Sequence, residues 1–363
     1  MRAAERPWGR PDPAVAQTRV AVRRALAELR EPGGADAAWP AVEGSPLVLV
    51  ALSGGADSLA LAAALAFEAP RAGVRSGAVI VDHGLQAASA EIAERAAGRA
   101  RALGLDPVLV RRVEVPGAAG GSAVGAGEGG PEAAARRARY AAIEAVRAEL
   151  GAGAVLTAHT RDDQAEQVIL ALARGSGTRA IAGIPPVRGA IRRPFLAVSR
   201  ETTARACAAQ GLEPWHDPHN DDPAYTRVRV RSTVLPLLER ELGPGIPANL
   251  ARTAELARED AEALDLLAAE ALDAAAERTD SGIRVAVPVL AGLPPALRTR
   301  VIRGAARAGT GAQLERVHTA AIAALVTDWR GQGPIDAPGL RVARIGDQLE
   351  FAPRDGRGRG ESA

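Results

Sequence analysis

Leu47 to Phe67, with the sequence LVLVALSGGADSLALAAALAF, is the stretch that decides the predicted fold. Its first six residues form an apolar run of strand length, and the residues from Leu59 onward suit a helix. Between them lies Ser53-Gly54-Gly55-Ala56-Asp57-Ser58. Two adjacent glycines permit a tight turn that brings backbone N–H groups close to an anion, while the serines add hydroxyl donors and the helix start adds a positive dipole end. The pattern favours a phosphate-binding turn over its alternative, a serine-capped strand-to-helix turn without a ligand.

Composition excludes several classes of protein. A Walker A phosphate loop requires a lysine, and this chain contains none. The 363 residues, 47% of them hydrophobic, predict a globular protein of two domains. Because the net charge is only +2, nucleic-acid binding would depend on local basic patches.

The single cysteine, Cys207, excludes an intramolecular disulfide and a cysteine-rich metal centre. Since no apolar run approaches the length of a membrane span and no signal-peptide pattern is present, we expect a soluble cytoplasmic protein.

Strand and helix patterns alternate along the first part of the chain. This alternation predicts an α/β fold with a Rossmann-like, doubly wound parallel sheet, whose ligands bind at the carboxyl ends of the strands. Beyond residue 211 the patterns are mainly helical. After the strand at 47–52, predicted strands cover 77–81, 107–115, 154–158, 191–195 and 282–287, with a hairpin over 340–351. Predicted helices cover 13–30, 131–150, 199–210, 232–242 and 247–277, with two more between 294 and 326.

These patterns divide the chain into five parts. They are an N-terminal helix and linker (1–45), an α/β domain (46–211), a linker (212–231), a smaller, mainly helical C-terminal domain (232–352) and a disordered tail (353–363).

A glycine-rich segment at 117–130 contains a literal G-x-G-x-x-G at Gly125, Gly127 and Gly130. Because a dinucleotide-binding fingerprint belongs at the first strand-to-helix turn, we interpret this segment as a mobile insertion instead.

Three polar motifs follow predicted strands: residues 53–58, Asp82-His83-Gly84 and residues 159–166. We expect them to meet, because a doubly wound sheet brings the carboxyl ends of its strands to one edge. Asp57 is a candidate Mg²⁺ ligand, since oxygen ligands together with phosphate suit that metal; the alternative is a helix-capping aspartate. His83 and His159 are candidate acid, base or phosphate contacts, or else hydrogen-bonded structural residues.

The motif at 159–166 gathers carboxylates at a helix start. Asp162 and Glu166 lie one turn apart with Asp163 beside them, so a cation between them, either Mg²⁺ or an ammonium group, would relieve their repulsion. The alternative is an acidic first turn that complements the helix dipole.

The six residues at 53–58 resemble the pyrophosphate loop (PP-loop) of the N-type ATP pyrophosphatases, enzymes that split ATP between its α and β phosphates. Further motifs extend the resemblance to the tRNA(Ile)-lysidine synthase family over roughly residues 47–326. In chain order these are Val81-Asp82-His83-Gly84-Leu85, Glu132 through Ala135-Arg136 to Arg139-Tyr140, Ala158-His159 with Asp162-Asp163-Gln164-Ala165-Glu166, Arg174-Gly175-Ser176-Gly177, Arg193-Pro194-Phe195, and Asp217-Pro218-His219-Asn220 with Arg227 to Arg231.

The resemblance implies an ATP-dependent ligase that modifies the wobble cytidine of tRNA(Ile) with the anticodon CAU. The cytosine C2 oxygen attacks the α-phosphate, pyrophosphate leaves, and the ε-amine of free L-lysine then displaces AMP to form lysidine. It implies a PP-loop adenylating domain at 46–211, a tRNA-binding or substrate-binding domain at 232–352, and ATP and Mg²⁺ as cofactors. The oligomeric state is open, with a homodimer as one option.

The resemblance also assigns roles to residues. Arg136, with Arg139 on the next turn, would stabilise the adenylate or the transferring phosphate, and the three carboxylates of the acidic motif would receive the lysine ammonium. The predicted catalytic residues are Asp57, Arg136, Asp162, Asp163 and Glu166. The predicted contacts to ATP are Ser53, Gly54, Gly55, Ala56, Asp57, Ser58, His83 and Arg174, with Asp57 as the metal ligand. The predicted RNA contacts are Arg139, Arg227, Arg229, Arg231, Arg298, Arg300 and Arg303, the last three on a basic helix face whose alternative is a solvated surface.

Two positions in or next to the acidic motif depart from the family pattern. Thr160 stands where the family often has a second histidine, and Gln167 stands where it often has threonine. Neither change removes a group that the chemistry needs.

Three other functions share parts of this pattern. A tRNA thiolase would adenylate a base and deliver sulfur, but such enzymes generally need paired cysteines or a cluster. A synthetase that amidates a small molecule would share the first loop without needing a basic helical C-terminal part. A non-catalytic nucleotide sensor would not release pyrophosphate in a substrate-dependent way.

Overall fold

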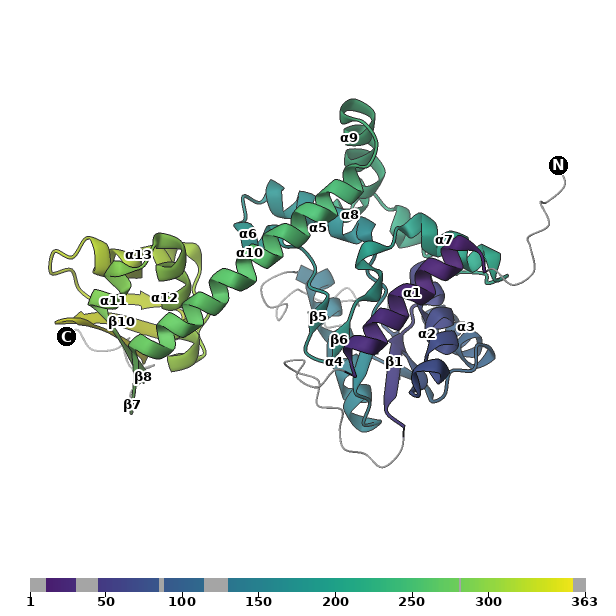
Figure 1. Cartoon of the computed structure of the whole chain (residues 1–363), viewed down its shortest axis with the longest axis horizontal. Coiled ribbons are helices and arrows are strands. Elements are labelled where there is room, and N and C mark those ends of the chain that lie inside the picture. The colour runs from purple at the N-terminus through teal and green to yellow at the C-terminus, as the bar shows by residue number, and fades with distance from the viewer. Residues whose placement is uncertain (1–10, 31–44, 85–87, 114–129, 281, 355–363) are drawn as a thin grey trace, which may run out of the picture. The chain divides into compact units, whose positions relative to one another are not determined.

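The computed structural model describes residues 11–30, 45–84, 88–113, 130–280 and 282–354 (Figure 1). The chain divides into two compact units, Met1–Glu255 and Leu256–Ala363, and the division falls inside the long helix α10 (Ile246–Ala275). It lies further along the chain than the predicted linker at 212–231. The predicted glycine-rich insertion, up to residue 129, and the tail after residue 354 lie outside the described residues. None of the described helices is long and apolar enough to cross a membrane.

The N-terminal unit is built on a six-stranded sheet with the strand order β3-β2-β1-β4-β6-β5. β1 pairs in parallel with both β2 and β4, β2 with β3, and β4 with β6, while the edge strand β5 runs antiparallel to β6. This confirms the predicted doubly wound parallel sheet, and the strand order reverses direction between β1 and β4. The strands are β1 (Leu47–Ala51), β2 (Arg75–Asp82), β3 (Val108–Arg112), β4 (Ala154–Leu156), β5 (Val187–Arg188) and β6 (Ile191–Arg192).

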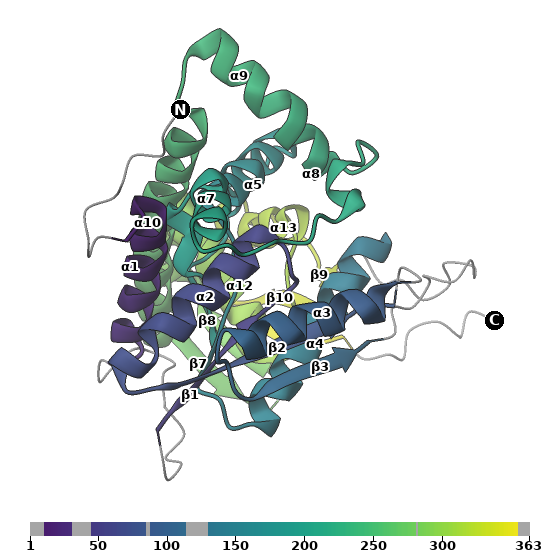
Figure 2. The same ribbon diagram turned by 90° about the vertical axis from the view of Figure 1, so that its right-hand side faces the viewer.

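Helices cover both faces of this sheet. The predicted N-terminal helix is present as α1, which starts at a proline and whose preceding residue, Asp12, accepts a hydrogen bond from the Ala14 N–H (2.8 Å). It packs against α2 and α7 (Figure 2). The helices are α1 (Pro13–Glu28), α2 (Ala56–Glu68), α3 (Ser89–Ala102), α4 (Gly130–Glu149), α5 (Arg161–Ala173), α6 (Thr178–Ile181), α7 (Arg200–Ala209), α8 (Thr226–Arg229) and α9 (Leu235–Leu242), with the π-helical segment η4 (Val230–Val234) between the last two.

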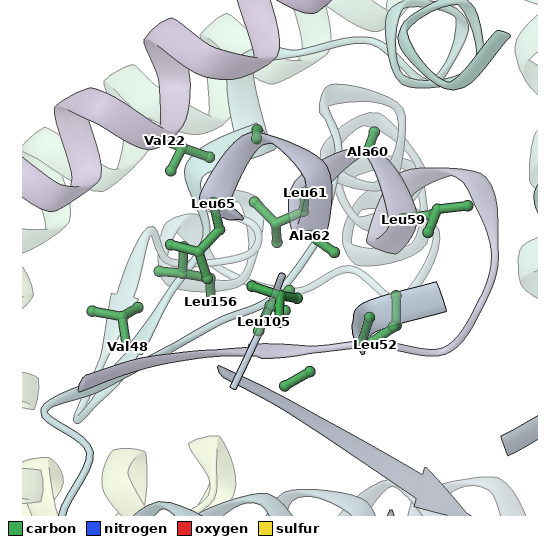
Figure 3. Close-up of a cluster of buried hydrophobic side chains, with 14 of the residues drawn as sticks. Val22, Val48, Leu52, Leu59, Ala60, Leu61, Ala62, Leu65, Leu105 and Leu156 are labelled. Atoms are coloured by element: carbon green, nitrogen blue, oxygen red, sulfur yellow. The ribbon is translucent and has the colours of Figure 1, made fainter. Parts of the chain in front are cut away.

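β1 is apolar throughout because side chains on both of its faces are buried. Val48 and Val50 pack into the core formed with α1, α2, α3 and α7, part of which is drawn in Figure 3. Leu47 and Leu49 point to the opposite face, where they pack with residues of α4. A strand buried on both faces reads as a continuous apolar run, and this is the pattern that the sequence contains.

The C-terminal unit is an antiparallel five-stranded sheet with helices packed on it, in the strand order β7-β8-β11-β10-β9. The predicted strand at 282–287 and the hairpin over 340–351 are present as β8 and β10–β11. The predicted helix at 247–277 is too long, because its last residues leave α10 and pair with β8 as β7. The strands are β7 (Ala276–Thr279), β8 (Gly282–Ala286), β9 (Ile335–Ala337), β10 (Leu340–Ile345) and β11 (Gln348–Pro353), and the helices are α11 (Val287–Gly292), α12 (Pro295–Thr310) and α13 (Arg316–Thr327).

Leu61 of α2 is fully buried in the core of Figure 3. We expect Leu61→Ala to lower the free energy of unfolding by about 2–5 kcal/mol, because it removes buried carbon atoms and leaves a cavity. Urea denaturation followed by circular dichroism measures this change. Leu242→Ala is the matched control, since Leu242 is 71% exposed and its truncation should change stability by less than about 0.5 kcal/mol. Equal losses in the two variants would contradict this description of the core.

Candidate active site

A glycine turn joins β1 to α2, as the sequence predicts. Gly54 has a φ of +88°, a left-handed conformation that favours glycine. The backbone N–H of Ser53 donates to the Ser58 hydroxyl (3.2 Å), and the two serine hydroxyl oxygens are 3.1 Å apart. The Ser58 hydroxyl in turn donates to the Gly55 carbonyl oxygen (3.0 Å). The serines therefore hold the two ends of the turn together.

The first turn of α2 has Gly55 as its N-cap, and within the described residues no side chain caps it. The Ser58 hydroxyl is directed to a carbonyl oxygen, so it does not take up a helix N–H group. The serine-capped alternative therefore does not fit this turn. Uncapped N–H groups and the positive end of the helix dipole make the start of α2 suited to an anion.

Asp57 lies in this first turn, in contact with α7. Its carboxylate accepts a hydrogen bond from the buried Thr203 hydroxyl, and the Arg200 Nε atom lies 3.8 Å away. Burial raises the pKa of Asp57 from 3.8 to about 6, although Thr203 and Arg200 act in the opposite direction. Asp163 and Asp162 raise it further by repulsion. The carboxylate is thus short of positive charge, a state that a bound cation would relieve.

The acidic motif begins α5 with a capping box. The Thr160 N–H donates to the Asp163 carboxylate (2.7 Å), and the Thr160 hydroxyl caps the Asp163 N–H (3.4 Å). Burial acts to raise the pKa of Asp163, but the Arg200 guanidinium and the hydrogen bonds from Thr160 hold it below its ordinary value. Thr160, which departs from the family pattern, is therefore the residue that starts this helix.

Glu166, one turn further, is completely buried and surrounded by guanidinium groups. Its Oε1 atom accepts from Arg231 Nε at 2.8 Å and from an Arg200 terminal nitrogen at 3.2 Å. Arg227 Nε lies 3.7 Å from Oε2, and Arg227 also donates to Gln167 (3.0 Å), the second departure from the family pattern. The charge of Glu166 is therefore matched by residues of α7, α8 and η4, which this carboxylate holds together.

Arg200, the first residue of α7, contacts all four predicted acidic site residues. Besides its guanidinium contacts to Asp57, Asp163 and Glu166, its backbone N–H donates to the Asp162 carboxylate (2.9 Å). Sequence reasoning did not select Arg200, because one arginine at a helix start has no distinguishing signal in a chain with 45 basic residues, all of them arginine. Arg200 thus supplies part of the positive charge that the sequence analysis sought in Mg²⁺ or an ammonium group.

Both predicted histidines are neutral at pH 7. Burial and the Arg139 guanidinium, whose Nε donates to His83 Nε2 at 3.0 Å, lower the pKa of His83 to about 4. Burial lowers the pKa of His159 to about 4 against the opposing effect of Asp163, and its Nδ1 lies 3.2 Å from the Thr157 hydroxyl. At physiological pH these rings are hydrogen-bonding groups and not cations.

Arg136 lies on α4 one turn from Tyr140. Its guanidinium is 5.2 Å from the centre of the Tyr140 ring, and its charge is close enough to His159 to lower the pKa of that ring. Among the described side chains no carboxylate pairs with Arg136, so its positive charge is available to a phosphate.

The other predicted arginines lie apart from this group. Arg174 caps the opposite end of α5 from the acidic motif, about 20 Å away at 1.5 Å per residue. Arg229 donates to carbonyl oxygens of the segment that precedes α8, at Pro223 (2.7 Å) and Ala224 (2.8 Å). The structure therefore does not bring these two to the carboxylates, and their proposed ligand contacts stay predictions.

The three predicted RNA contacts of the C-terminal unit each make an internal hydrogen bond. Arg298 donates to the Leu290 carbonyl oxygen (2.8 Å), Arg300 to Asp265 (3.0 Å) and Arg303 to the Thr319 hydroxyl (3.2 Å). A guanidinium has five N–H donors, so each retains capacity for a further acceptor. Their role in RNA binding stays a prediction.

Two family models match the chain: the PP-loop domain over residues 20–238 and the TilS substrate binding domain over residues 286–349. The first covers more than half of the chain and identifies it as a member of the PP-loop class. The tRNA(Ile)-lysidine synthase of Leifsonia xyli subsp. xyli is 58% identical over 308 residues, which are 85% of this chain and 90% of that protein. The one of Streptomyces coelicolor is 52% identical over 356 residues, 92% of this chain and 96% of that protein. Within the class, the chain belongs to the tRNA(Ile)-lysidine synthase family of ligases.

The raised pKa of Asp57 predicts how stability depends on pH. Between about pH 4 and 6 the folded chain binds more protons at this carboxyl than the unfolded chain, so its contribution to stability falls as the pH rises and stays low above pH 6. We expect Asp57→Asn to raise the free energy of unfolding above pH 7 by about 1–3 kcal/mol, with no gain near pH 4. Denaturant unfolding with EDTA at the two pH values measures this.

The control for that variant is Asp273→Asn on α10, because Asp273 is exposed. It should leave stability unchanged at both pH values. A gain from Asp57→Asn of equal size at pH 4 and above pH 7 would show that the buried charge is not its cause.

The guanidinium cluster predicts that Glu166 is required for stability. Glu166→Ala leaves three arginines without their buried counter-charge, so we expect the free energy of unfolding to fall by about 3–5 kcal/mol. Thermal and urea unfolding measure it, with the exposed Glu201→Ala of α7 as the matched control. A normally stable Glu166→Ala enzyme would contradict this role and favour direct contact with a substrate.

Proposed function

We propose that this chain ligates free L-lysine to C2 of the wobble cytidine of CAU-anticodon tRNA(Ile), through an adenylated tRNA, with release of AMP and pyrophosphate. Membership of the tRNA(Ile)-lysidine synthase family supports this reaction. The structural observation that carries it is the uncapped start of α2 behind the Gly54 turn, with Asp57 beside it. On α4, Arg136 contacts Tyr140 and has no carboxylate partner among the described side chains. Together these supply hydrogen-bond donors and positive charge for a triphosphate, and a carboxylate for its metal.

In the first step the C2 oxygen of cytosine attacks the α-phosphorus of ATP, and the bond between this phosphorus and the bridging oxygen to the β-phosphate breaks. Pyrophosphate leaves with the electron pair. The backbone N–H groups at the start of α2 would face the departing charge, and Arg136 would face the phosphate being transferred. Adenylation turns the C2 oxygen into a good leaving group, so the residues mainly position the reactants and neutralise charge.

In the second step the ε-amine of lysine attacks C2. The C2–O bond breaks, AMP leaves with the oxygen, and the attacking amine loses a proton. We propose that Asp162 and Asp163 receive an ammonium group of the bound lysine, because both are only partly buried. Glu166 is fully buried against arginines, so we assign it to holding those elements in place.

Asp57 would hold Mg²⁺ together with phosphate oxygens. Within the described residues no group of three or more metal-ligating side chains is assembled, which fits a metal bound largely by its substrate and suits Mg²⁺. When bound, Mg²⁺ would neutralise charge on the departing pyrophosphate. We propose that the C-terminal unit provides further contacts to the tRNA.

The test is incorporation of radiolabelled lysine into a transcript of CAU-anticodon tRNA(Ile), with ATP and Mg²⁺. We expect label in this transcript and none in elongator methionine tRNA. Asp57→Ala and Arg136→Ala should each reduce incorporation by at least about 100-fold, in line with the loss of one preorganised charge in a transfer site. Arg137→Ala is the matched control, since Arg137 is the exposed neighbour of Arg136 on α4 and should retain activity.

Other results would point to other functions. Release of pyrophosphate that depends on tRNA, without incorporation of lysine, would keep the adenylation and reject lysine as the nucleophile, which favours thiolation. Release that depends on a small molecule and not on tRNA would favour an amidating synthetase. Absence of any substrate-dependent release would favour a nucleotide sensor.

A further inference from the structure

A cavity of about 190 Å³ lies beside the PP-loop, and apart from Gly54 its lining residues have no part in the chemistry proposed above. It opens between α3 and the segment 213–216, and one of its walls is Gly54. The remaining lining residues are Ile92, Arg95, Ala96, Arg99, Glu213, Pro214, Trp215 and His216.

The segment 213–216 is held against the loop. The Trp215 N–H donates to the Gly54 carbonyl oxygen (2.9 Å), and a Cβ atom on Gly54 would lie 3.9 Å from the Trp215 Cβ. His216 Nε2 lies 2.7 Å from an Asp221 carboxylate oxygen. The backbone that carries Trp215 is therefore fixed. Trp215 is only partly buried and lines the cavity, and its indole ring makes no hydrogen bond or cation–π contact to any described side chain.

The opposite wall is basic. Arg95 and Arg99 lie one turn apart on the same face of α3. Arg99 has no ion-pair partner in the described part of the chain, and the nearest carboxylate to Arg95 is that of Glu91 at 4.0 Å, with both side chains more than half exposed. Such a pair contributes little. Glu213 is the one acidic residue in the lining, against two arginines.

This combination fits a nucleotide. An indole face stacks on a nucleobase, and guanidinium groups bind phosphate. The cavity is smaller than the 300–1,000 Å³ or so of sites that enclose a drug-sized ligand, so it suits one base or one phosphate group and not a whole ATP molecule. We propose that this cavity binds one unpaired nucleotide of the tRNA substrate, with its base on Trp215 and a phosphate at Arg95 and Arg99. The proposal rests on the function proposed above.

Gly54 belongs both to the cavity lining and to the PP-loop, so the proposed subsite lies beside the site of the reaction. The carbonyl oxygen of Gly54 is bound to the Trp215 N–H, while the following residues form the start of α2 that faces phosphate. A nucleotide in the cavity therefore lies next to the loop that handles ATP. This arrangement suits a reaction in which RNA and ATP are bound at the same time.

The test uses the full chain and a fluorescently labelled transcript of CAU-anticodon tRNA(Ile), with binding followed by anisotropy over a range of salt concentrations. Trp215→Ala should weaken binding by about 5-fold to 150-fold, the loss expected for one stacked base, and Trp215→Phe should retain most of the affinity. Arg99→Ala should reduce the slope of log affinity against log salt by about 0.7, the value for one phosphate contact of a single strand.

A control variant tests whether a loss of tRNA affinity is specific to the cavity. Arg101→Ala removes an arginine from the same helix but outside the cavity lining. It should bind the tRNA more tightly than the cavity variants. The affinity for ATP, measured by equilibrium dialysis, should be unchanged in Trp215→Phe and Arg99→Ala.

Three results would overturn the proposal. They are wild-type tRNA affinity in both Trp215→Ala and Arg99→Ala, an equal loss in Arg101→Ala, or a loss of ATP affinity in Arg99→Ala that accounts for the loss of tRNA. A failure of the proposed function would give a different result from a failure of the subsite. If the wild-type chain binds this tRNA and Trp215→Ala weakens it, but no lysine is incorporated, the subsite stands and the reaction is wrong.

Discussion

Parallel pairing of β1 between β2 and β4 is the constraint on which the candidate site depends. Because these three strands run in the same direction, their carboxyl ends lie at one edge, where Arg200 joins the motifs that follow β1 and β4. The apolar run of β1 is required for this, since a strand with neighbours on both sides and side chains buried on both faces has no place for a polar residue. The PP-loop then begins where that run ends.

Charge balance is the second constraint on this edge. Glu166 is buried, and the guanidinium groups around it join α7, α8 and η4 to α5. Asp57 has the Arg200 guanidinium only at 3.8 Å among the described side chains, and burial raises its pKa to about 6. The ionised Asp57 carboxylate lowers the stability of the free protein, so a cation bound beside it would stabilise the protein. Carboxylates that look alike in the sequence therefore have different roles in the structure. Glu166 holds elements of the fold together, whereas Asp57 remains open to a ligand.

Much of the site could be predicted because its motifs are local. The glycine turn, Asp57 and the acidic start of α5 follow from residue types at fixed spacing, and the structure brings them to one edge. Arg200 was missed because its importance comes from contacts with residues 34 to 143 positions away, to which no local pattern points. In the C-terminal unit the short strands β7 and β9 were missed for the same reason, since three or four residues become a strand only when a partner strand lies beside them.

The sequence by itself determined the order of strands and helices, the parallel sheet, the phosphate-suited turn and the family resemblance. These depend on periodicity and backbone conformation, which neighbouring residues impose. Only the tertiary structure decided that Glu166 is enclosed by arginines and that His83 and His159 are neutral. It also decided that Trp215, Arg95 and Arg99 line one cavity. Burial and charge pairing bring together residues that are far apart in the chain, so they arise only when the chain is folded.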